Sequence, residues 1–264
     1  MGRFFPYLGG KTALVPRLLE LIPPHRVYVE VFGGSAELLF SKPRSQGEVY
    51  NDLNGELVNL FLVARDRHRE LKGRLDMLPY SRLLYEKWKT EYRRGDVPGD
   101  DVERAARYYY LLCGSFAGKP WGGWAFDRRR VRGYWSNRRL RVIREVHRRL
   151  QGVAVEHKDF RDLIRLYDGP DAFFFLDPPY LETTGYGVGF GEAEHRALAE
   201  ILIHAEGRWL LTVEEHPLMR ELYAGCIVDE VGQSLNSEKI GLGGTRRRLS
   251  NLIVANYQPL QVCH

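Results

Sequence analysis

One stretch sets the architecture of this chain: AFFFLDPPY, residues 172–180. Its opening run of apolar residues, 172–176, is typical of a strand that is buried on both faces, as strands at the centre of a parallel sheet are. The strand must end at Asp177, because neither Pro178 nor Pro179 can donate a backbone N–H to a neighbouring strand. The sequence therefore predicts that Asp177 lies at the carboxyl edge of a sheet, where open α/β sheets bind their ligands.

Outward from this strand, apolar runs alternate with helical patterns along most of the chain. Strands that alternate with helices predict an α/β fold, with a parallel sheet covered by helices on both faces. The mainly helical stretch 66–150 interrupts this rhythm, so we expect one domain built from residues 1–65 and 151–264, with residues 66–150 inserted as a subdomain. Strands are expected near residues 26–31, 48–50, 152–156, 172–176, 208–213, 226–231 and 251–256, and helices near 35–39, 53–67, 80–93, 102–112, 138–150, 160–166, 192–205 and 217–223.

The tetrapeptide DPPY, residues 177–180, combines two hydrogen-bond acceptors with an aromatic ring. An exocyclic amine on a nucleobase is a poor nucleophile, because its lone pair is delocalised into the ring. The carboxylate of Asp177 and the carbonyl of Pro178 can accept both N–H bonds of such an amine and orient its lone pair, while Tyr180 stacks on the base. A Pro-Pro loop with a capping aspartate is the alternative, and the position directly after a buried strand favours the chemical interpretation.

A second stretch, VYVEVFGGSAELLF at residues 27–40, reads as strand, glycine turn and helix. Asp52 follows the next strand, 19 residues after Gly33. An acid at that place can accept hydrogen bonds from ribose hydroxyls. It can also serve as the N-cap of the following helix, and the two roles are compatible.

The residues GGKT at positions 9–12 look like the end of a phosphate-binding loop, but Phe5 stands where that loop needs a glycine. Lys11 instead opens an apolar-periodic stretch, and a lysine beside free N–H groups at a helix N-terminus suits a small carboxylate. An exposed lysine after a turn is the simpler alternative. A ligand with a ribose, an adenine and an amino-acid end, but without phosphates, fits these residues. S-adenosylmethionine is such a molecule.

Composition narrows the class of protein. With 264 residues, 44% of them hydrophobic, the chain can form one large domain or one domain with an insertion. Its apolar runs are too short to cross a bilayer, and its N-terminus lacks the apolar region of a signal peptide. Cys113, Cys226 and Cys263 are scattered. We therefore expect a cytoplasmic protein with neither a disulfide framework nor a metal site.

Positive charge is concentrated in one segment. Residues 128–149 contain ten arginines and a single acid, Glu145, in a chain whose net charge is +5. Arginine with interleaved aromatic residues suits phosphate contact and base stacking, whereas the helical spacing of the apolar residues there also fits a solvated helix face. The candidate nucleic-acid-binding residues are Arg128, Arg129, Arg130, Arg132, Tyr134, Trp135 and Arg138.

Several separated motifs together resemble one family. PYLGGK, YVEVFGGSAELLF, YNDLNGELVNLF, KDF and FFFLDPPY occur in this order, and FGEAEHRALAEIL, GRWLLTV, MRELYAG and NLIVANY follow. They resemble the Dam-type (D12 class) adenine-N6 DNA methyltransferases, and the resemblance covers both ends of the chain. It implies a Rossmann-like methyltransferase sheet with residues 66–150 as the target-recognition subdomain. It also implies transfer of a methyl group from S-adenosylmethionine to adenine N6 in double-stranded DNA, with the base flipped out of the duplex and no metal ion.

The resemblance assigns roles to individual residues. The expected catalytic residues are Asp177, Pro178 and Tyr180. The expected cofactor-binding residues are Tyr7, Gly10, Lys11, Glu30, Gly33, Asp52, Asp159, Phe160 and Asp177.

Departures from the family pattern leave some details open. Val31 stands where the family usually has Pro, and Ala36 stands where it often has Gly. The stretch 111–118, LLCGSFAG, differs from the family's recognition run. No target such as GATC is therefore assumed. The acceptors of the DPPY motif also suit cytosine N4, and an RNA substrate or a non-catalytic DNA-binding protein are further alternatives. The oligomeric state and a role in a restriction system, a virus or a host are not determined by these residues.

Overall fold

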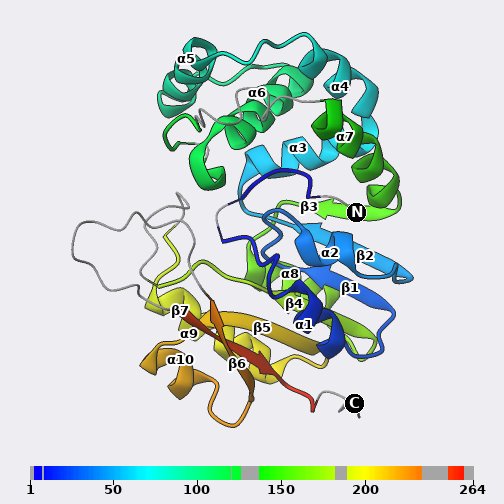
Figure 1. Ribbon diagram of the computed structural model, residues 1–264. Helices are drawn as coiled ribbons and strands as arrows, with labels where there is room; N and C mark the ends of the chain where they lie inside the picture. Colours follow the sequence, from blue (N-terminus) through cyan, green and yellow to red (C-terminus); the bar gives the residue numbers. More distant parts are fainter. Residues whose placement is uncertain are drawn as a thin grey trace, which may run out of the picture. The chain divides into compact units, whose positions relative to one another are not determined.

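The computed structural model of the protein describes residues 3–7, 9–119, 121–125, 137–181, 189–233 and 249–258 (Figure 1). The chain divides into two compact units. The first, called the helical unit below, comprises Met1–Val15, Gly34–Pro43 and Asp52–His157, and the second, called the sheet unit, comprises Pro16–Gly33, Arg44–Asn51 and Lys158–His264.

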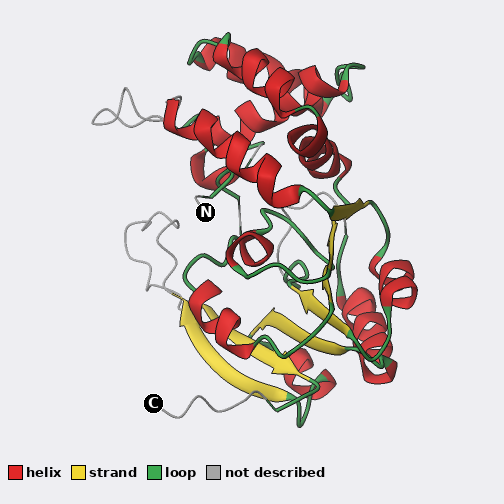
Figure 2. Ribbon diagram, turned by 90° about the vertical axis from the view of Figure 1, so that its right-hand side faces the viewer, coloured by secondary structure: helices red, strands yellow, loops and turns green. Residues whose placement is uncertain are grey.

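The strands form a mixed seven-stranded sheet in the order β3-β2-β1-β4-β5-β7-β6, drawn in yellow in Figure 2. β1 pairs in parallel with β2 and β4, and β4 pairs in parallel with β5. β4 is buried along its whole length at the centre of the sheet, as its apolar sequence predicts. The strands are β1 (Val27–Glu30), β2 (Gly47–Asn51), β3 (Val153–Glu156), β4 (Ala172–Leu176), β5 (Arg208–Glu214), β6 (Ile227–Gln233) and β7 (Leu249–Ala255).

The sheet is mixed, because the predicted parallel part is extended by antiparallel strands at the C-terminal end of the chain. β7 runs antiparallel to both β5 and β6, and it lies between them. A parallel neighbour requires a crossover connection, whereas two consecutive strands can pair directly as antiparallel neighbours. The alternation of strands and helices therefore predicted the parallel part of the sheet correctly but not the direction of its last strand.

The sheet unit carries helices on both faces of its sheet, as expected for an α/β fold. α8 (Phe160–Tyr167), α9 (Glu192–His204) and α10 (Pro217–Leu222) contribute to the apolar core on one face, and α1 (Val15–Leu21) meets the other. Val29 and Leu211 belong to the first face. On the second face, the Tyr257 hydroxyl donates to the Leu21 carbonyl over 2.8 Å, and the Tyr257 ring contacts Phe173.

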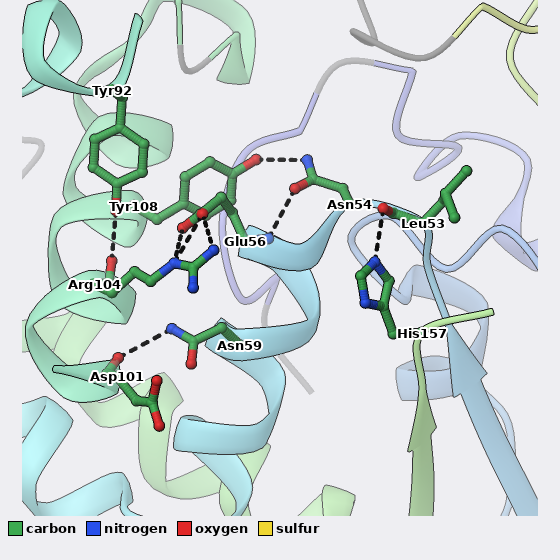
Figure 3. A network of polar contacts seen from close by, with 9 residues as sticks. All are labelled: Leu53, Asn54, Glu56, Asn59, Tyr92, Asp101, Arg104, Tyr108 and His157. Carbon is green, nitrogen blue, oxygen red and sulfur yellow. Dashed lines mark hydrogen bonds and ion pairs between the residues drawn. The ribbon is translucent and has the colours of Figure 1, made fainter. Parts of the chain in front are cut away.

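The helical unit is built around α6, whose buried face is rich in tyrosine and leucine. α3 packs against α6 and α7, α4 packs against the same two helices, and α5 packs against α6. Arg104 on α6 pairs with Glu56 on α3 over 2.8 Å, an interaction drawn in Figure 3. The helices of this unit are α2 (Glu37–Ser41), α3 (Gly55–Asp66), α4 (His68–Asp76), α5 (Arg82–Arg93), α6 (Asp101–Gly114) and α7 (Asn137–Leu150).

Local sequence signals start several of these helices. The side chains of Asn54, Ser81 and Asp100 accept hydrogen bonds from backbone N–H groups in the first turns of α3, α5 and α6, which satisfies donors that a helix otherwise leaves unpaired. α4 is a helix that the strand and helix pattern did not predict. Its buried residues Leu71 and Leu75 have the i, i+4 spacing of an amphipathic helix.

The chain folds back on itself shortly after the end of α6. Ser115 and Trp124 form an antiparallel bridge, and the Phe116 N–H donates to the Gly123 carbonyl over 2.9 Å. The role of residues 66–150 in target recognition stays a prediction. Across the described ranges, every helix is too short or too polar to cross a bilayer.

Candidate active site

The DPPY turn begins where β4 leaves the sheet. The parallel register of β4 and β5 pairs Leu176 with Leu211, so the next residues along the two strands, Asp177 and Thr212, lie side by side. The Thr212 hydroxyl donates to Asp177 Oδ1 over 2.7 Å. Thr212 is fully buried, whereas Asp177 is only partly so. The carboxylate therefore stands at the carboxyl edge of the sheet, as predicted, and is held there by a neighbouring strand.

Two further hydrogen bonds attach the end of the DPPY turn to the sheet. The Tyr180 hydroxyl donates to Oδ1 of Asn251, a buried residue on β7. The Leu181 N–H donates to Oε1 of Glu214, at the end of β5, over 2.5 Å. Asn251 and Glu214 are themselves paired across the antiparallel ladder. The position of Tyr180 is thus set by contacts with two strands, across sequence separations of 33 and 71 residues.

The middle of the turn is held by His195 on α9. Its Nε2 lies 3.2 Å from the Pro179 carbonyl, and because a carbonyl only accepts, Nε2 carries the proton and Nδ1 does not. Nδ1 is buried and has no hydrogen-bond partner among the described residues. Burial lowers the pKa of His195 to about 4, against a smaller opposing effect of the Pro179 carbonyl. His195 is therefore neutral at physiological pH and acts as a hydrogen-bond donor to the turn.

Asn51, the last residue of β2, connects three segments at the carboxyl edge of the sheet unit. Its amide nitrogen donates to the Val31 carbonyl over 2.9 Å and to the Lys158 carbonyl over 3.1 Å, and its amide oxygen accepts from the Lys158 N–H. Its backbone carbonyl accepts from the Gly33 N–H over 2.7 Å. The ends of β1 and β2 and the start of α8 are therefore fixed to one another by a single buried side chain.

Glu30 is the last residue of β1, and Gly33 lies in the turn that follows the strand. A Cβ atom at Gly33 would lie 2.2 Å from the ring of Tyr50, which only a glycine avoids. Glu30 is buried and accepts a hydrogen bond from the Tyr28 hydroxyl over 2.8 Å. Both residues lie at the edge where the sequence placed them.

Asp159 and Phe160 lie at the start of α8. Asp159 is the N-cap of this helix: its side chain accepts from the Arg161 N–H over 2.9 Å and also pairs with the Arg161 guanidinium. Phe160 is buried, with ring centroids 5.9 Å from Phe32 and 5.7 Å from Phe190. The pair thus combines a helix-capping acid with an aromatic cluster at the start of α8, next to the end of β1.

In the helical unit, the Asp52 carboxylate accepts hydrogen bonds from two backbone N–H groups. Oδ2 accepts from Gly34 and Oδ1 accepts from Asn54, each over 2.8 Å. Gly34 has a left-handed φ of 49°, which favours glycine, and the Tyr7 ring lies 3.1 Å from where a Cβ of Gly34 would be. Burial raises the pKa of Asp52, and the two N–H groups oppose that rise. Tyr7, the glycine turn and Asp52 are therefore neighbours.

The alternative role of Asp52 as the helix N-cap is wrong, because Asn54 holds that position. The Asn54 side chain accepts from the Glu56 N–H over 3.0 Å and donates to the Tyr108 hydroxyl on α6, also over 3.0 Å (Figure 3). His157 Nε2 donates to the Leu53 carbonyl over 3.0 Å. Hydrogen bonds at Leu53 and Asn54 therefore hold the loop that carries Asp52. The N-cap of α3 is the side chain of Asn54 and not the Asp52 carboxylate.

Lys11 and Gly10 lie in a turn rather than at the start of a helix. α1 begins only at Val15, and the backbone carbonyl of Lys11 accepts from Leu14 and Val15. The Gly10 N–H donates to the Tyr7 carbonyl over 3.2 Å. The Lys11 side chain is 6% exposed, so the alternative of an exposed lysine after a turn is wrong.

The structure thus gathers the expected site residues into two sets, one in each unit. Six of the expected nucleic-acid contacts lie outside the described residues, and Arg138 lies in α7 without a described side chain. No sequence signal pointed to Thr212, His195 or Asn251, because each is a common residue in an ordinary strand or helix pattern. The helical unit holds Tyr7, Gly10, Lys11 and Asp52, and the sheet unit holds Glu30, Gly33, Asp159, Phe160, Asp177, Pro178 and Tyr180.

The sheet-unit set has the chemistry needed to hold an amine. A carboxylate and a turn carbonyl next to one another are acceptors for two N–H bonds, and an aromatic ring lies two residues further on. In the described ranges, no three His, Cys, Asp or Glu side chains are grouped so as to hold a metal ion.

Comparison with known proteins agrees with this chemistry. The chain is 24% identical over 277 aligned positions to the type II methyltransferase M1.LlaDCHI of Lactococcus lactis subsp. cremoris, an alignment that covers 96% of this chain and 95% of that protein. The family model for D12 class N6 adenine-specific DNA methyltransferases matches residues 7–234, most of the chain. The protein therefore belongs to the D12 class of N6 adenine-specific DNA methyltransferases.

Proposed function

We propose that this DNA adenine methyltransferase uses S-adenosylmethionine as its methyl donor. That molecule supplies a methyl group on a sulfonium, which is a good leaving group. The residues fit it chemically: the buried Lys11 ammonium and Tyr7 suit its amino-acid end, and the acceptor oxygens of Asp52 suit ribose hydroxyls. The aromatic ring of Phe160, which packs near Phe32, suits an adenine ring. Gly10, Glu30, Gly33 and Asp159 complete the proposed cofactor-binding set.

The target amine is held by the DPPY turn. Asp177 and the carbonyl of Pro178 accept its two N–H bonds and direct its lone pair towards the methyl group, and Tyr180 stacks on the base. The observation that carries this proposal is the position of Asp177, which stands at the end of a central strand with one carboxylate oxygen bonded to Thr212. Adenine N6 is inside the duplex, so the base has to leave the stack to reach this carboxylate.

DNA contacts are assigned to the arginine-rich segment. Arg128, Arg129, Arg130, Arg132 and Arg138 would neutralise phosphates, and Tyr134 and Trp135 would stack on bases or sugars. Residues 66–150 would form the target-recognition subdomain, and residues 1–65 and 151–264 the catalytic domain. Because the Lactococcus relative is named a type II methyltransferase, we assign this enzyme to a restriction-modification system.

The proposal is tested by methyl transfer with labelled S-adenosylmethionine, first on genomic DNA and then on RNA. Digestion of the product to nucleosides should give N6-methyladenine from DNA. Sequencing of DNA from cells that express the protein, with detection of modified adenines, identifies the target site. Label found mainly in N4-methylcytosine or in RNA would overturn the substrate assignment, and no transfer at all would favour the non-catalytic alternative.

Base flipping and the arginine contacts need separate measurements. With 2-aminopurine in place of the target adenine, enzyme binding should raise its fluorescence, because an extruded base is no longer quenched by stacking. Neutralising Arg128, Arg129, Arg130 and Arg132 together should weaken DNA binding and reduce the slope of log K against log salt by about 0.9 for each phosphate that the variant no longer neutralises. Unchanged fluorescence or an unchanged salt slope would remove the corresponding assignment.

A further inference from the structure

Thr212 places a buried hydroxyl group directly against the DPPY carboxylate. The side chain is fully buried, and Oγ1 lies 2.7 Å from Asp177 Oδ1 and 3.4 Å from the Leu176 carbonyl. A hydroxyl has one proton to donate. The shorter contact, to a charged acceptor, takes that proton, because hydrogen bonds to an ionised carboxylate are both shorter and stronger than neutral ones.

The sheet leaves Thr212 little freedom to move. β5 lies between β4 and β7, and Thr212 is paired across the antiparallel ladder with Ile253 on β7. The strand residues on both sides of it, Leu211 and Val213, are buried in the apolar core. The hydroxyl is therefore a fixed point, whereas the χ2 rotation of an aspartate is broad unless something holds it.

We propose that Thr212 is a positioning residue for methyl transfer, which holds Asp177 Oδ1 and so orients the carboxylate for the target amine. The proposal rests on the proposed function of Asp177 as an acceptor for that amine. Thr212 keeps its proton throughout and touches neither the base nor the methyl donor. Supporting groups of this kind matter because an acceptor that is free to rotate holds its partner in a productive geometry for only part of the time.

Two matched pairs of variants isolate the hydroxyl from the rest of the side chain. Thr212→Val keeps the shape of threonine and removes the hydroxyl, and Thr212→Ser keeps the hydroxyl and removes a methyl group. Thr212→Ala lacks both, so the pair Ser and Ala again differs by the hydroxyl alone. Tyr257→Phe is the control for removal of a partly buried hydroxyl hydrogen bond, because it acts at Leu21 and Phe173, near the other end of the strands.

The kinetic expectation is a change in turnover without a change in binding. Thr212→Val and Thr212→Ala should lower kcat by about 10- to 100-fold, the range typical for removal of a supporting partner, with KM for S-adenosylmethionine and for DNA within about twofold of wild type. Thr212→Ser should stay within about threefold of the wild-type kcat, and Tyr257→Phe should match wild type. Thermal unfolding of each variant gives the folded fraction by which kcat is normalised.

The outcomes separate this inference from the function on which it rests. If Asp177→Ala is inactive but Thr212→Val turns over normally, or if the Ser and Ala variants are equally fast, the positioning role is wrong and the role of Asp177 stands. Weaker binding of substrate with an unchanged kcat would also overturn it. If Asp177→Ala itself keeps near-normal turnover, the proposed function of the DPPY turn fails, and the role of Thr212 fails with it.

Discussion

Two aspartates each follow a parallel strand, and the chain holds them in different ways. Asp52, after β2, accepts a backbone N–H on each of its oxygens, from Gly34 and from Asn54. Asp177, after β4, accepts on Oδ1 from the side chain of Thr212, on the neighbouring strand. The first carboxylate is held by hydrogen bonds from backbone N–H groups. The second is anchored through a side chain.

This difference indicates how each acid can be used. A carboxylate that satisfies two backbone donors is part of the loop structure, and removing it leaves those donors unpaired. The Asp177 carboxylate accepts from a side-chain hydroxyl on a neighbouring strand instead, and its proposed role is to hold the target amine. We therefore expect substitutions at Asp52 to affect stability and cofactor binding, and substitutions at Asp177 to affect the chemical step.

The largest expected effect is that of Asp177→Ala. Without the acceptor for the target amine, the rate of labelled methyl transfer should fall by about 100- to 1,000-fold, as it does when a preorganised electrostatic group is removed from other active sites. Affinity for S-adenosylmethionine, measured by calorimetry, should stay within about twofold of wild type. Near-normal rates would show that this acid is structural too and would end the contrast with Asp52.

Asp52→Ala tests the other side of the comparison. It leaves the N–H groups of Gly34 and Asn54 without their acceptor, which should lower the free energy of unfolding by about 2 kcal/mol and raise KM for S-adenosylmethionine. The kcat at saturating cofactor should fall far less than in Asp177→Ala. Asp52→Asn, which keeps one carbonyl oxygen, is the matched control. Wild-type stability together with a collapse of kcat would reverse the assigned roles.

His195, which donates a hydrogen bond to the DPPY turn, makes the free energy of unfolding of the protein pH-dependent. Its folded pKa of about 4 lies below the ordinary value of 6.5, so between these values the unfolded chain binds the proton and the folded chain does not. The free energy of unfolding therefore has its full value above about pH 6.5. It falls by up to about 3 kcal/mol as the pH decreases towards about 4.

The measurement is denaturant unfolding between pH 4 and pH 8. His195→Gln keeps an N–H donor for the Pro179 carbonyl but cannot titrate, so its stability should depend less on pH across this window. His204→Gln, an exposed histidine on the same helix, should follow wild type. Identical pH dependence in wild type and His195→Gln would mean that this histidine is not held neutral beneath the turn.

The smallest expected effect is that of Tyr180→Phe. This variant lacks the hydroxyl bond to Asn251 but keeps the ring, so the rate of methyl transfer should fall by only about twofold to fivefold. Tyr180→Ala also removes the stacking surface and should fall by about tenfold or more, since base stacking on an aromatic side chain contributes about 1–3 kcal/mol. Equal rates for the two variants would show that the ring itself does not contact the base.

Most elements could be predicted from the sequence, because their signals are local. The apolar run of β4 and the two prolines after it placed Asp177 at the edge of a central strand, and the fold class is confirmed. The wrong predictions have physical reasons. Asp52 and Asn54 are both good N-cap residues, and only the start of α3 at Gly55 decides between them. α4 is predominantly charged, so its two buried leucines formed a weak pattern.

The order of strands and helices and the chemical groups at the strand ends follow from the sequence alone, since hydrophobic periodicity and proline act over a few residues. The partners of the DPPY turn follow only from the tertiary structure. Thr212 is 35 residues from Asp177, His195 is 16 from Pro179, and Asn251 is 71 from Tyr180. These contacts depend on the register and direction of the strands and on the position of α9, all of which are set by non-local packing. A one-residue shift in strand register would abolish the contacts between strands.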